Sequence, residues 1–287
     1  MIKNLSFFLL YCFGFLLANC QNHGKLEIVT DLPSSLKETS GLVSYTNYSF
    51  WAIEDSGNAD RIYQLNFKGE ILKDLKVKNG KNQDWEDLTK DKLGNIYIGD
   101  FGNNANTRKN LVIYKLPNPE IEPGDKIDAE KIEFSYPEQK EFPPKKDALY
   151  FDAEAFFHWN KALYLITKNR SRPYDGKAYI YKIPDEPGEY KAELVTEWTI
   201  CEDANSCSAT SAAISEDEKT IAILTYGKLL LFTDFTSANF VQGKLETIDL
   251  NYRSQLEAVC FLNNSTLLLA DERVKITGGN LYQFHLN

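Results

Sequence analysis

The sequence lacks most of the residues from which enzymes build metal and nucleotide sites. Only three histidines occur in 287 residues, and none of the five cysteines forms a C-x-x-C pair. Because zinc sites are usually built from closely spaced Cys and His ligands, a zinc site is not expected. The G-x-S-x-G, H-E-x-x-H and P-loop motifs are absent as well. Serine hydrolase, zincin and nucleotide-binding functions therefore have no support in the sequence.

The sequence also has fewer basic than acidic residues. The chain has 32 Lys and Arg against 41 Asp and Glu, which gives a formal net charge of -9. A protein that binds nucleic acid needs a basic surface to neutralise phosphates, and no basic stripe is present. A nucleic-acid partner is therefore not expected, whereas cations, sugars, other small molecules and proteins stay open as ligands.

Helix signals are almost absent, and strand signals take their place. Short segments of alternating apolar and polar residues, rich in aromatic and β-branched side chains, are separated by Gly, Asn, Asp and Pro. This pattern is typical of β-strands joined by turns. With 43% hydrophobic residues the chain can also bury a full core. The predicted fold class is all-β.

A short pattern recurs five times along the chain. The segments that carry it are Thr39–Leu42, Trp85–Leu88, Ala153–Phe156, Thr210–Ala213 and Leu256–Val259. The second residue of each is a Ser or a Glu, and the residue fourteen positions later closes an apolar run. Repeats of several strands at intervals of roughly 40 to 50 residues are typical of β-propeller blades. The sequence thus predicts a β-propeller of five blades, or of six if Pro117–Tyr150 holds a degenerate blade.

The last repeat contains only three predicted strands before the sequence ends at Asn287. We expect Lys25–Thr30 to supply the missing fourth strand and close the ring, which would remove the exposed edges of an open sheet. Blades bury their faces only against neighbouring blades. Residues 25–287 are therefore expected to form a single domain, which is predicted to be a monomer.

The N-terminus has the pattern of an export signal. Lys3 precedes the apolar stretch Leu5–Leu17, which is short for a membrane span, and the stretch leads into Ala18, Asn19 and Cys20. This end resembles a bacterial lipobox, in which the signal is cut before a cysteine that then carries lipid. We predict a signal peptide at residues 1–19, lipid on Cys20 and a short tether at residues 20–24. The protein would be anchored in the bacterial cell envelope, in the periplasm or at the outer membrane, with secretion as the alternative.

Three cysteines remain in the predicted mature domain. Cys201 and Cys207 lie in one polar segment, and an exported protein matures in an oxidising compartment. They are therefore predicted to form a disulfide. Cys260 lies in an apolar strand and is predicted to be a buried free thiol.

The repeats also predict where functional groups gather. The first strand of each propeller blade lines the central channel, so the second residues of the repeats and their partners fourteen positions later should surround one channel mouth. These pairs are Ser40 and Glu54, Glu86 and Asp100, Glu154 and Lys168, Ser211 and Thr225, and Glu257 and Asp271. Six carboxylates around one axis repel one another unless protons, hydrogen-bond donors or cations neutralise them.

A site of oxygen ligands without His or Cys favours calcium, which accepts many oxygens in irregular geometry. The predicted metal ligands are Glu86, Asp100, Asn103, Glu154, Glu257 and Asp271. The predicted ligand-binding residues are Glu54, Asp55, Asn104 and Arg170. The three glutamates could instead accept hydrogen bonds from backbone amides of neighbouring strands and lock blade to blade, and this structural alternative stays open.

The first repeats resemble a known family. Four segments are similar to the opening blade of the SdiA-regulated and phytase-like exported propellers: Glu38–Leu42, Phe50–Asp55, Arg61–Leu65 and Gly69–Leu72. Trp85–Leu88 resembles that family's acidic-glycine segment, with Asp87 where glycine is commoner. The resemblance implies a propeller, export, and calcium in or near the channel.

More distantly, the chain is similar to the gluconolactonase group of propellers. In that group a metal held by Glu, Asn and Asp activates water against a lactone. The similarity points to Glu86, Asn103 and Asp271 as the positions to test for such roles.

Two functions of different kinds follow. The first is an exported, non-enzymatic lipoprotein whose acidic channel mouth binds a divalent cation and a carbohydrate or protein ligand. The second is a metal-dependent hydrolase of a lactone or phosphoester, in which the metal lowers the pKa of a bound water. The candidate catalytic residues are Glu86, Glu154 or Glu257 as the base and Lys168 or Arg273 as the group that stabilises negative charge. A purely structural interaction module is a third alternative.

Overall fold

The structure is a computed structural model that describes residues 22–204 and 206–286. The predicted signal peptide at residues 1–19 and the predicted lipidation site Cys20 lie outside the described residues. Within the described part, the regular elements are β-strands and two short 3-10 helices, η1 (Pro119–Ile121) and η2 (Phe240–Gln242). No helix of that part is long and apolar enough to cross a membrane. The predicted all-β class is confirmed.

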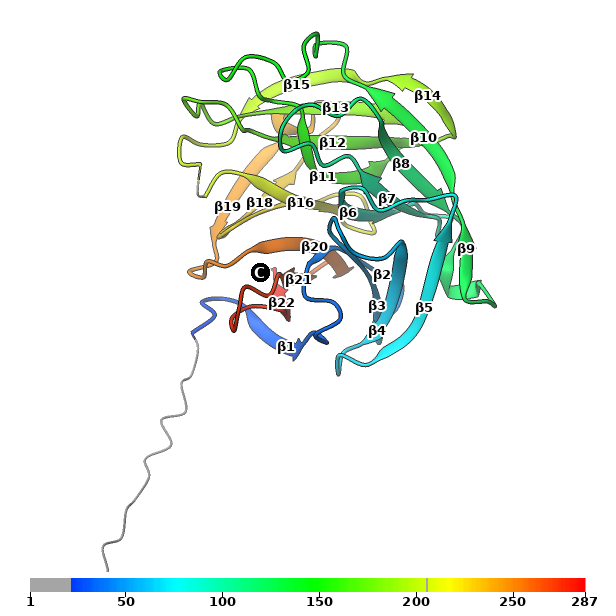
Figure 1. Cartoon of the computed structure of the whole chain (residues 1–287). Helices are drawn as coiled ribbons and strands as arrows, with labels where there is room; N and C mark the ends of the chain where they lie inside the picture. Colours follow the sequence, from blue (N-terminus) through cyan, green and yellow to red (C-terminus); the bar gives the residue numbers. More distant parts are fainter. Residues whose placement is uncertain (1–21, 205, 287) are drawn as a thin grey trace, which may run out of the picture.

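The strands form five sheets around a common axis, as in a five-bladed β-propeller (Figure 1). From the innermost strand outward, blade 1 contains β2 (Thr39–Ser44), β3 (Ser49–Glu54), β4 (Arg61–Asn66), β5 (Ile71–Lys78) and β9 (Lys126–Asp128). Blade 2 contains β6 (Trp85–Lys90), β7 (Ile96–Asp100), β8 (Leu111–Leu116), β10 (Glu130–Ser135) and β14 (Gly188–Lys191). Blade 3 contains β11 (Asp152–Trp159), β12 (Ala162–Lys168), β13 (Lys177–Pro184) and β15 (Glu193–Thr199).

Blade 4 contains β16 (Ala209–Ile214), β17 (Ile221–Thr225), β18 (Lys228–Thr233) and β19 (Lys244–Asp249). Blade 5 contains β20 (Leu256–Asn263), β21 (Thr266–Asp271), β22 (Asn280–His285) and, outermost, β1 (Glu27–Asp31). β1 pairs antiparallel with β22 and comes from the start of the described chain. The segment in which a sixth blade was considered instead supplies the outer strands β9 and β10 to blades 1 and 2. The propeller therefore has five blades.

The hydrophobic core is divided among the interfaces between neighbouring blades. Each of five buried clusters joins two adjacent blades. Trp51 on β3 and Trp85 on β6, for example, are both fully buried in the cluster between blades 1 and 2. Gly41 lets the inner strands of these blades approach closely, because a Cβ there would lie 2.6 Å from the backbone nitrogen of Leu88. Each blade is thus stabilised by its neighbours rather than by a core of its own.

Each inner strand carries a β-bulge near its start. At the bulge one residue has no partner on the second strand of the blade, and this residue is free to project differently from its neighbours. The unpaired residues are Ser40, Glu86, Glu154, Thr210 and Glu257. The predicted second residues of the repeats coincide with the bulge except in blade 4, where the bulge falls on Thr210 and not on Ser211.

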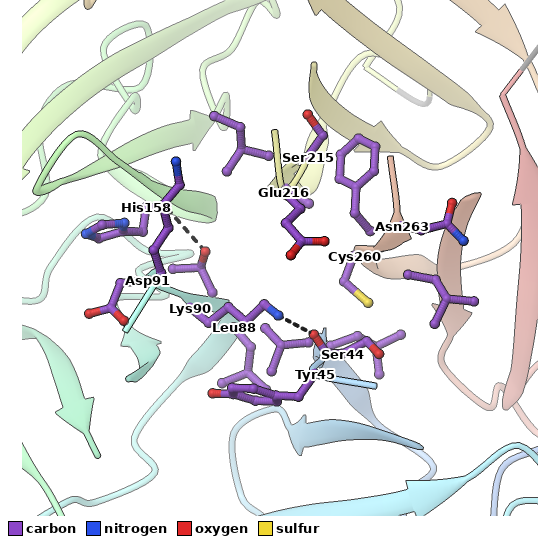
Figure 2. A pocket seen from close by; sticks show the side chains of 18 of the residues that line it. Ser44, Tyr45, Leu88, Lys90, Asp91, His158, Ser215, Glu216, Cys260 and Asn263 are labelled. Atoms are coloured by element: carbon purple, nitrogen blue, oxygen red, sulfur yellow. Dashed lines mark hydrogen bonds between the residues drawn. The ribbon is translucent and has the colours of Figure 1, made fainter. Parts of the chain in front are cut away.

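Asp87 closes the centre of the ring. Its Oδ1 accepts hydrogen bonds from the backbone of Leu88 and the hydroxyl of Ser211, both at 2.9 Å, and its Oδ2 accepts from the backbone of Phe156 and Ala212, both at 3.1 Å. Ser211 in turn accepts a hydrogen bond from the backbone of Val259 at 3.0 Å. These contacts join blades 2, 3, 4 and 5 at a point where Asp87 and Ser211 are both 0% exposed. The channel therefore has two separate mouths, an acidic one and an opposite one that opens into a cavity (Figure 2).

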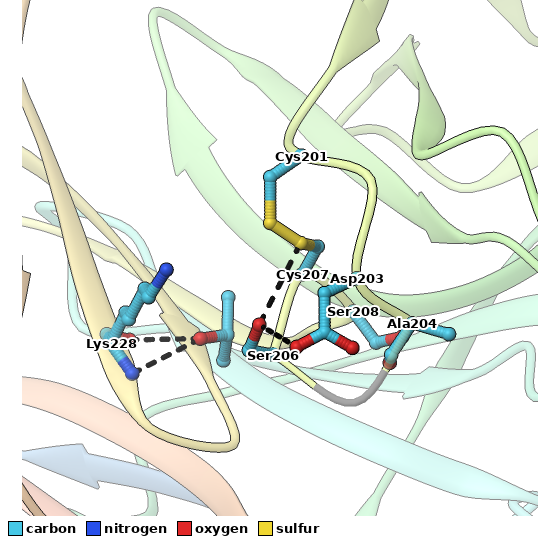
Figure 3. The surroundings of a disulfide bond; sticks show 8 residues. Cys201, Asp203, Ala204, Ser206, Cys207, Ser208 and Lys228 are labelled. Carbon is cyan, nitrogen blue, oxygen red and sulfur yellow. Dashed lines mark hydrogen bonds between the residues drawn. A yellow bond between two sulfur atoms is a disulfide. The ribbon is translucent and has the colours of Figure 1, made fainter.

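Cys201 and Cys207 form a disulfide in the loop between β15 and β16 (Figure 3). Beside it, the hydroxyl of Ser206 donates to the carboxylate of Asp203 at 2.6 Å. Cys260 on β20 is a buried free cysteine. The disulfide links the two ends of this loop, which directly precedes the inner strand of blade 4.

Candidate functional site

Three carboxylates converge at the acidic mouth of the channel. Oxygens of Asp55, Asp84 and Glu86 lie within 4.8 Å of one another. Asp55 follows β3, Asp84 precedes β6, and Glu86 is the bulged residue of β6. Glu86 is only 8% exposed, and its carboxylate has no hydrogen-bond or ion-pair partner among the described residues. The three carboxyl groups therefore lie close together, and the most buried of them, Glu86, has no hydrogen-bond donor beside it among the described residues.

Gly102 provides the space that these oxygens occupy. A Cβ at this position would overlap Oε1 of Glu86 and would lie 2.5 Å from Oδ2 of Asp84. The backbone nitrogen of Gly102 also donates to the carbonyl of Asp84 at 3.3 Å. The loop after β7 thus wraps closely around the two carboxylates, and a larger residue would displace them.

The carboxylates of the mouth shift one another toward the protonated form. Burial raises the pKa of Glu86 well above its usual range, and repulsion from Glu154, Asp55, Asp152 and Asp84 adds to the shift. Burial likewise raises the pKa of Asp55 to about 6. A cation placed between these groups would act in the opposite direction, because it favours the ionised form of each carboxylate.

Two basic side chains neutralise the part of the mouth formed by blade 3. Nζ of Lys168 lies 3.1 Å from Oε2 of Glu154. Arg170 binds Oε1 of Glu154 through Nη2 and Oδ2 of Asp152 through Nε, each at 2.6 Å. Burial acts to raise the pKa of Glu154, but Lys168 and Arg170 outweigh it, and the net shift is downward. Glu154 is therefore an ionised carboxylate whose two oxygens already have cationic partners.

Blade 5 adds two further carboxylates, Glu257 and Glu272. Burial raises the pKa of Glu257 to about 8, although the nearby Lys168 opposes the shift. Burial raises the pKa of Glu272 to about 7, and repulsion from Asp55 contributes. Tyr226 of blade 4 accepts a hydrogen bond from Lys168 at 2.9 Å and completes the rim. Near neutral pH, Glu257 can therefore gain or release a proton.

Two of the predicted metal ligands lie within their own blades and not in the cluster of Asp55, Asp84 and Glu86. Asp271 accepts hydrogen bonds from the hydroxyl of Tyr282 and the backbone of Asn280, both at 2.9 Å. Asp100 accepts from Arg108 at 2.9 Å and from the backbone of Asp84 at 3.1 Å. Both carboxylates hold loops of their own blade in place.

The pairing of the first two strands explains this difference. Glu54, Asp100 and Asp271 each pair with the residue just before the bulge of the inner strand. Successive side chains of a strand point to opposite faces, so the next residue along the chain faces the mouth. In blades 1 and 5 these next residues are Asp55 and Glu272.

Lys168 reaches the mouth because the first hairpin of blade 3 is one residue shorter. There the residue before the bulge, Ala153, pairs with Thr167, and Lys168 takes the position that follows. Tyr226 stands at the same position in blade 4, one residue after the paired Thr225. The residue fourteen positions after the second residue of a repeat therefore faces the mouth in blade 3 but not in blades 1, 2 and 5.

Three other predicted site residues are not members of the cluster of Asp55, Asp84 and Glu86. Asn103 lies in the loop after β7 and contacts the start of β11: its backbone nitrogen donates to Asp152 at 2.6 Å and its side-chain nitrogen to the carbonyl of Phe151 at 3.0 Å. Arg273 donates to the carbonyl of Leu32 at 2.9 Å. Glu54 is buried, which raises the pKa of its carboxyl to about 7.

Asn104 and Arg170, both predicted to bind a ligand, line a common pocket of about 560 Å³. Lys146 and Arg172 line the same pocket, and none of its described lining residues is a carboxylate. Because Arg170 also binds Glu154, this basic pocket adjoins the acidic mouth.

Sequence reasoning missed Asp84, Glu272 and Gly102. Asp84 lies two residues before Glu86, so strand alternation could have placed both on one face. Glu272 directly follows the predicted Asp271 and would have been selected by a shift of one residue. No sequence signal distinguishes Gly102 from the other glycines of the loops, because its role depends on side chains that approach it in space.

Solved structures with a similar fold are known. No protein-family model and no curated protein matches the chain. Among solved structures, the PQQ-bound aldose sugar dehydrogenase from Streptomyces coelicolor is 10% identical over 91% of this chain and 97% of its own, with a TM-score of 0.51. The chain is a β-propeller. The resemblance to the SdiA-regulated and phytase-like propellers stays a prediction.

Two further structures are similar at lower scores. One, from a nidogen/laminin complex, is 11% identical over 82% of this chain and 72% of its own, with a TM-score of 0.47. The other, the Cps50 (Swd1) β-propeller domain of Myceliophteria thermophila, is 9% identical over 91% of this chain and 100% of its own, with a TM-score of 0.44. At such identities the similarity concerns the fold alone.

Proposed function

We propose that the acidic mouth binds a divalent cation and that calcium is the preferred ion. The observation that carries the proposal is the convergence of Asp55, Asp84 and Glu86, with Glu86 buried and without a partner. An ionised carboxylate that is buried without a donor or a cation is costly. The residues present fit calcium, because every side chain of the group offers oxygen and none offers nitrogen or sulfur.

The ligand of the site would be anionic or polar and would enter beside the cation. The basic pocket formed by Asn104, Lys146, Arg170 and Arg172 supports this part of the proposal. Arg170 connects the pocket to the mouth through its ion pair with Glu154. A carbohydrate that bears carboxylates, or an acidic segment of a protein, would satisfy the basic pocket and the cation together.

Calorimetry on the domain from residue 22 onward, after treatment with a chelator, tests the cation site. We expect calcium to bind with measurable heat and to raise the melting temperature, and we expect Glu86→Gln to weaken binding at least tenfold. Glu246→Gln is the matched control, because Glu246 is an exposed residue on the outer strand of blade 4. The proposal would be contradicted if calcium produced neither heat nor a shift in melting temperature, or if Glu86→Gln bound calcium as tightly as the parent protein.

A metal-dependent hydrolase is the second candidate function, and Glu257 favours it. Its pKa of about 8 suits proton transfer near neutral pH, and Lys168 beside it could stabilise negative charge. A panel of lactones and phosphoesters, assayed with calcium or magnesium, should then show turnover that Glu257→Gln reduces at least a hundredfold, which is the lower range for removal of a general acid or base. Turnover unchanged in this variant would contradict the role of Glu257.

We further propose that the protein is an exported lipoprotein. The support is the sequence pattern that ends at Cys20. In a bacterial host, Cys20→Ala should release the protein from the membrane fraction, and mass spectrometry of the parent protein should find lipid on an N-terminal cysteine. An unmodified N-terminus at any other residue would contradict lipidation.

A further inference from the structure

The mouth opposite the acidic cluster opens into a cavity that the proposed function does not use. The cavity has a volume of about 650 Å³ and is lined by the ends of the inner strands and by the turns that follow them. Asp87 and Ser211 lie fully buried between this cavity and the acidic mouth. A volume of this size is within the range of pockets that hold small molecules. The cavity is therefore an independent place for a ligand.

Part of the cavity wall is apolar. Leu88, Ala213 and Phe261 come from three different blades, line the cavity and are buried at 9% exposure or less. Cys260 also lines it, and burial raises the pKa of its thiol to about 12, so the thiol is uncharged near neutral pH. This part of the wall offers contacts to a hydrocarbon group and no fixed charge.

One ammonium group projects into the cavity without an anionic partner. Nζ of Lys90 donates to the carbonyl of Ser44 at 2.5 Å and lies 4.6 Å from the centre of the Tyr45 ring. No carboxylate oxygen of the described residues lies within 4.0 Å of it. A lysine ammonium has three donors, so two remain for a ligand. Burial lowers the pKa of Lys90, as expected for a cation held away from bulk water.

One carboxylate faces the same cavity and likewise forms no ion pair with any residue that the structure describes. Glu216, in the turn after β16, is exposed, and its charge acts on Lys90 although the two groups form no ion pair. Figure 2 shows the two side chains extending toward the middle of the cavity from different blades. The remaining ionisable neighbours are engaged: Asp91 with Tyr97 at 3.1 Å, His158 with Asp185 at 2.8 Å and Glu218 with Lys92 at 2.8 Å.

We propose that this cavity binds an α-amino acid with an apolar side chain. The carboxylate of the ligand would bind Lys90, its ammonium would bind Glu216, and its side chain would lie against Leu88, Ala213 and Phe261. Two opposite charges that face one cavity without touching are complemented by a molecule that carries both charges. A ligand without a carboxylate would leave the partly buried Lys90 without an anionic partner, at a cost in affinity, and a ligand without an ammonium would lack the attraction of Glu216.

The test is calorimetric titration of the folded domain with L-phenylalanine and two derivatives that each lack one charge. N-acetyl-L-phenylalanine keeps only the carboxylate, and L-phenylalaninamide keeps only the ammonium. We expect L-phenylalanine to bind, and each derivative to bind at least tenfold more weakly. Tight binding of the acetylated derivative would show an anion site instead and would overturn the proposal, as would the absence of binding by phenylalanine, leucine and valine alike.

Variants of the two charged residues complete the test. Lys90→Met and Glu216→Gln should each weaken binding of L-phenylalanine at least tenfold, whereas Lys68→Met and Glu246→Gln, which change exposed residues outside the cavity, should not. Glu216 lies on an exposed turn, so its variant will fold even if Lys90→Met does not. Unchanged affinity in Glu216→Gln would overturn the assignment. Calcium is absent from these titrations, so their outcome is independent of the cation proposed for the other mouth.

Discussion

The neighbouring acids Asp87 and Glu86 should respond in opposite ways to the same replacement by an amide. Asp87 accepts four hydrogen bonds, three of them from backbone nitrogens of three different blades. Burial raises the pKa of Asp87, but an environment of donors alone fits the ionised form, which accepts and does not donate. Glu86, one residue earlier, accepts no hydrogen bond from residues 22–204 or 206–286.

The loss in Asp87→Asn can be worked from these contacts. An amide has one oxygen and one NH2 group, so whichever way it turns, at least one buried backbone N–H faces another donor. A buried donor without a partner costs about 1 to 3 kcal/mol, and the remaining bonds lose the extra strength of a charged acceptor. We expect a total loss of about 3 kcal/mol in the free energy of unfolding. For a domain of this size that corresponds to a fall of roughly 6 to 12 °C in melting temperature.

The assay is thermal and urea unfolding of the domain in the presence of a chelator. Glu86→Gln is the control, and we expect its melting temperature without calcium to equal or exceed that of the parent, because it loses repulsion and no hydrogen bond. The reasoning is refuted if Asp87→Asn is destabilised by less than 1 kcal/mol, or if Glu86→Gln is destabilised as much as Asp87→Asn. Equal losses would mean that both acids serve the packing of the blades.

Three further predictions concern the acidic mouth. Lys168→Met leaves the buried Glu154 with one cationic partner, and urea unfolding should show a loss of about 3 kcal/mol, the usual cost of breaking a buried ion pair; a loss below 1 kcal/mol would contradict this. Gly102→Ala should weaken calcium binding at least tenfold in calorimetry, because its Cβ would displace Glu86, and unchanged affinity would show that Glu86 is not a ligand. In chelator, the melting temperature should fall as pH rises from about 4.5 to about 8, because folded Glu257 keeps a proton that the unfolded chain has released. Calcium should reduce this fall, and a melting temperature independent of pH would refute the proposed shift.

The blades could be predicted from sequence because their signal is local. Alternation of apolar and polar residues defines each strand, and the repeat defines how strands are grouped. The repeat segment Trp85–Leu88, for example, lies at the start of β6. The number of blades was harder, because β9 and β10 lie where a sixth blade was considered and only their pairing shows that they extend blades 1 and 2.

The positions of the candidate site residues could be predicted only in part, and the errors in position have one cause. Glu86, Glu154 and Glu257 were predicted correctly as equivalent positions, and each is the bulged residue of its strand. The fixed spacing of fourteen residues failed because side chains alternate and hairpins differ in length, so an error of one residue moves a side chain to the other face. Asp271 was chosen in this way in place of its neighbour Glu272.

The comparison between Asp87 and its neighbours also bears on what the acidic mouth is for. A carboxylate that serves to lock blades together is surrounded by donors, as Asp87 is. Glu154 has a different kind of partner, since Lys168 and Arg170 neutralise it. Glu86 has neither among the described residues, although it is buried beside Asp55 and Asp84. The structural alternative considered for the three glutamates therefore fits Asp87 better than Glu86, and the absence of a described partner for Glu86 is the observation on which the proposed cation site depends.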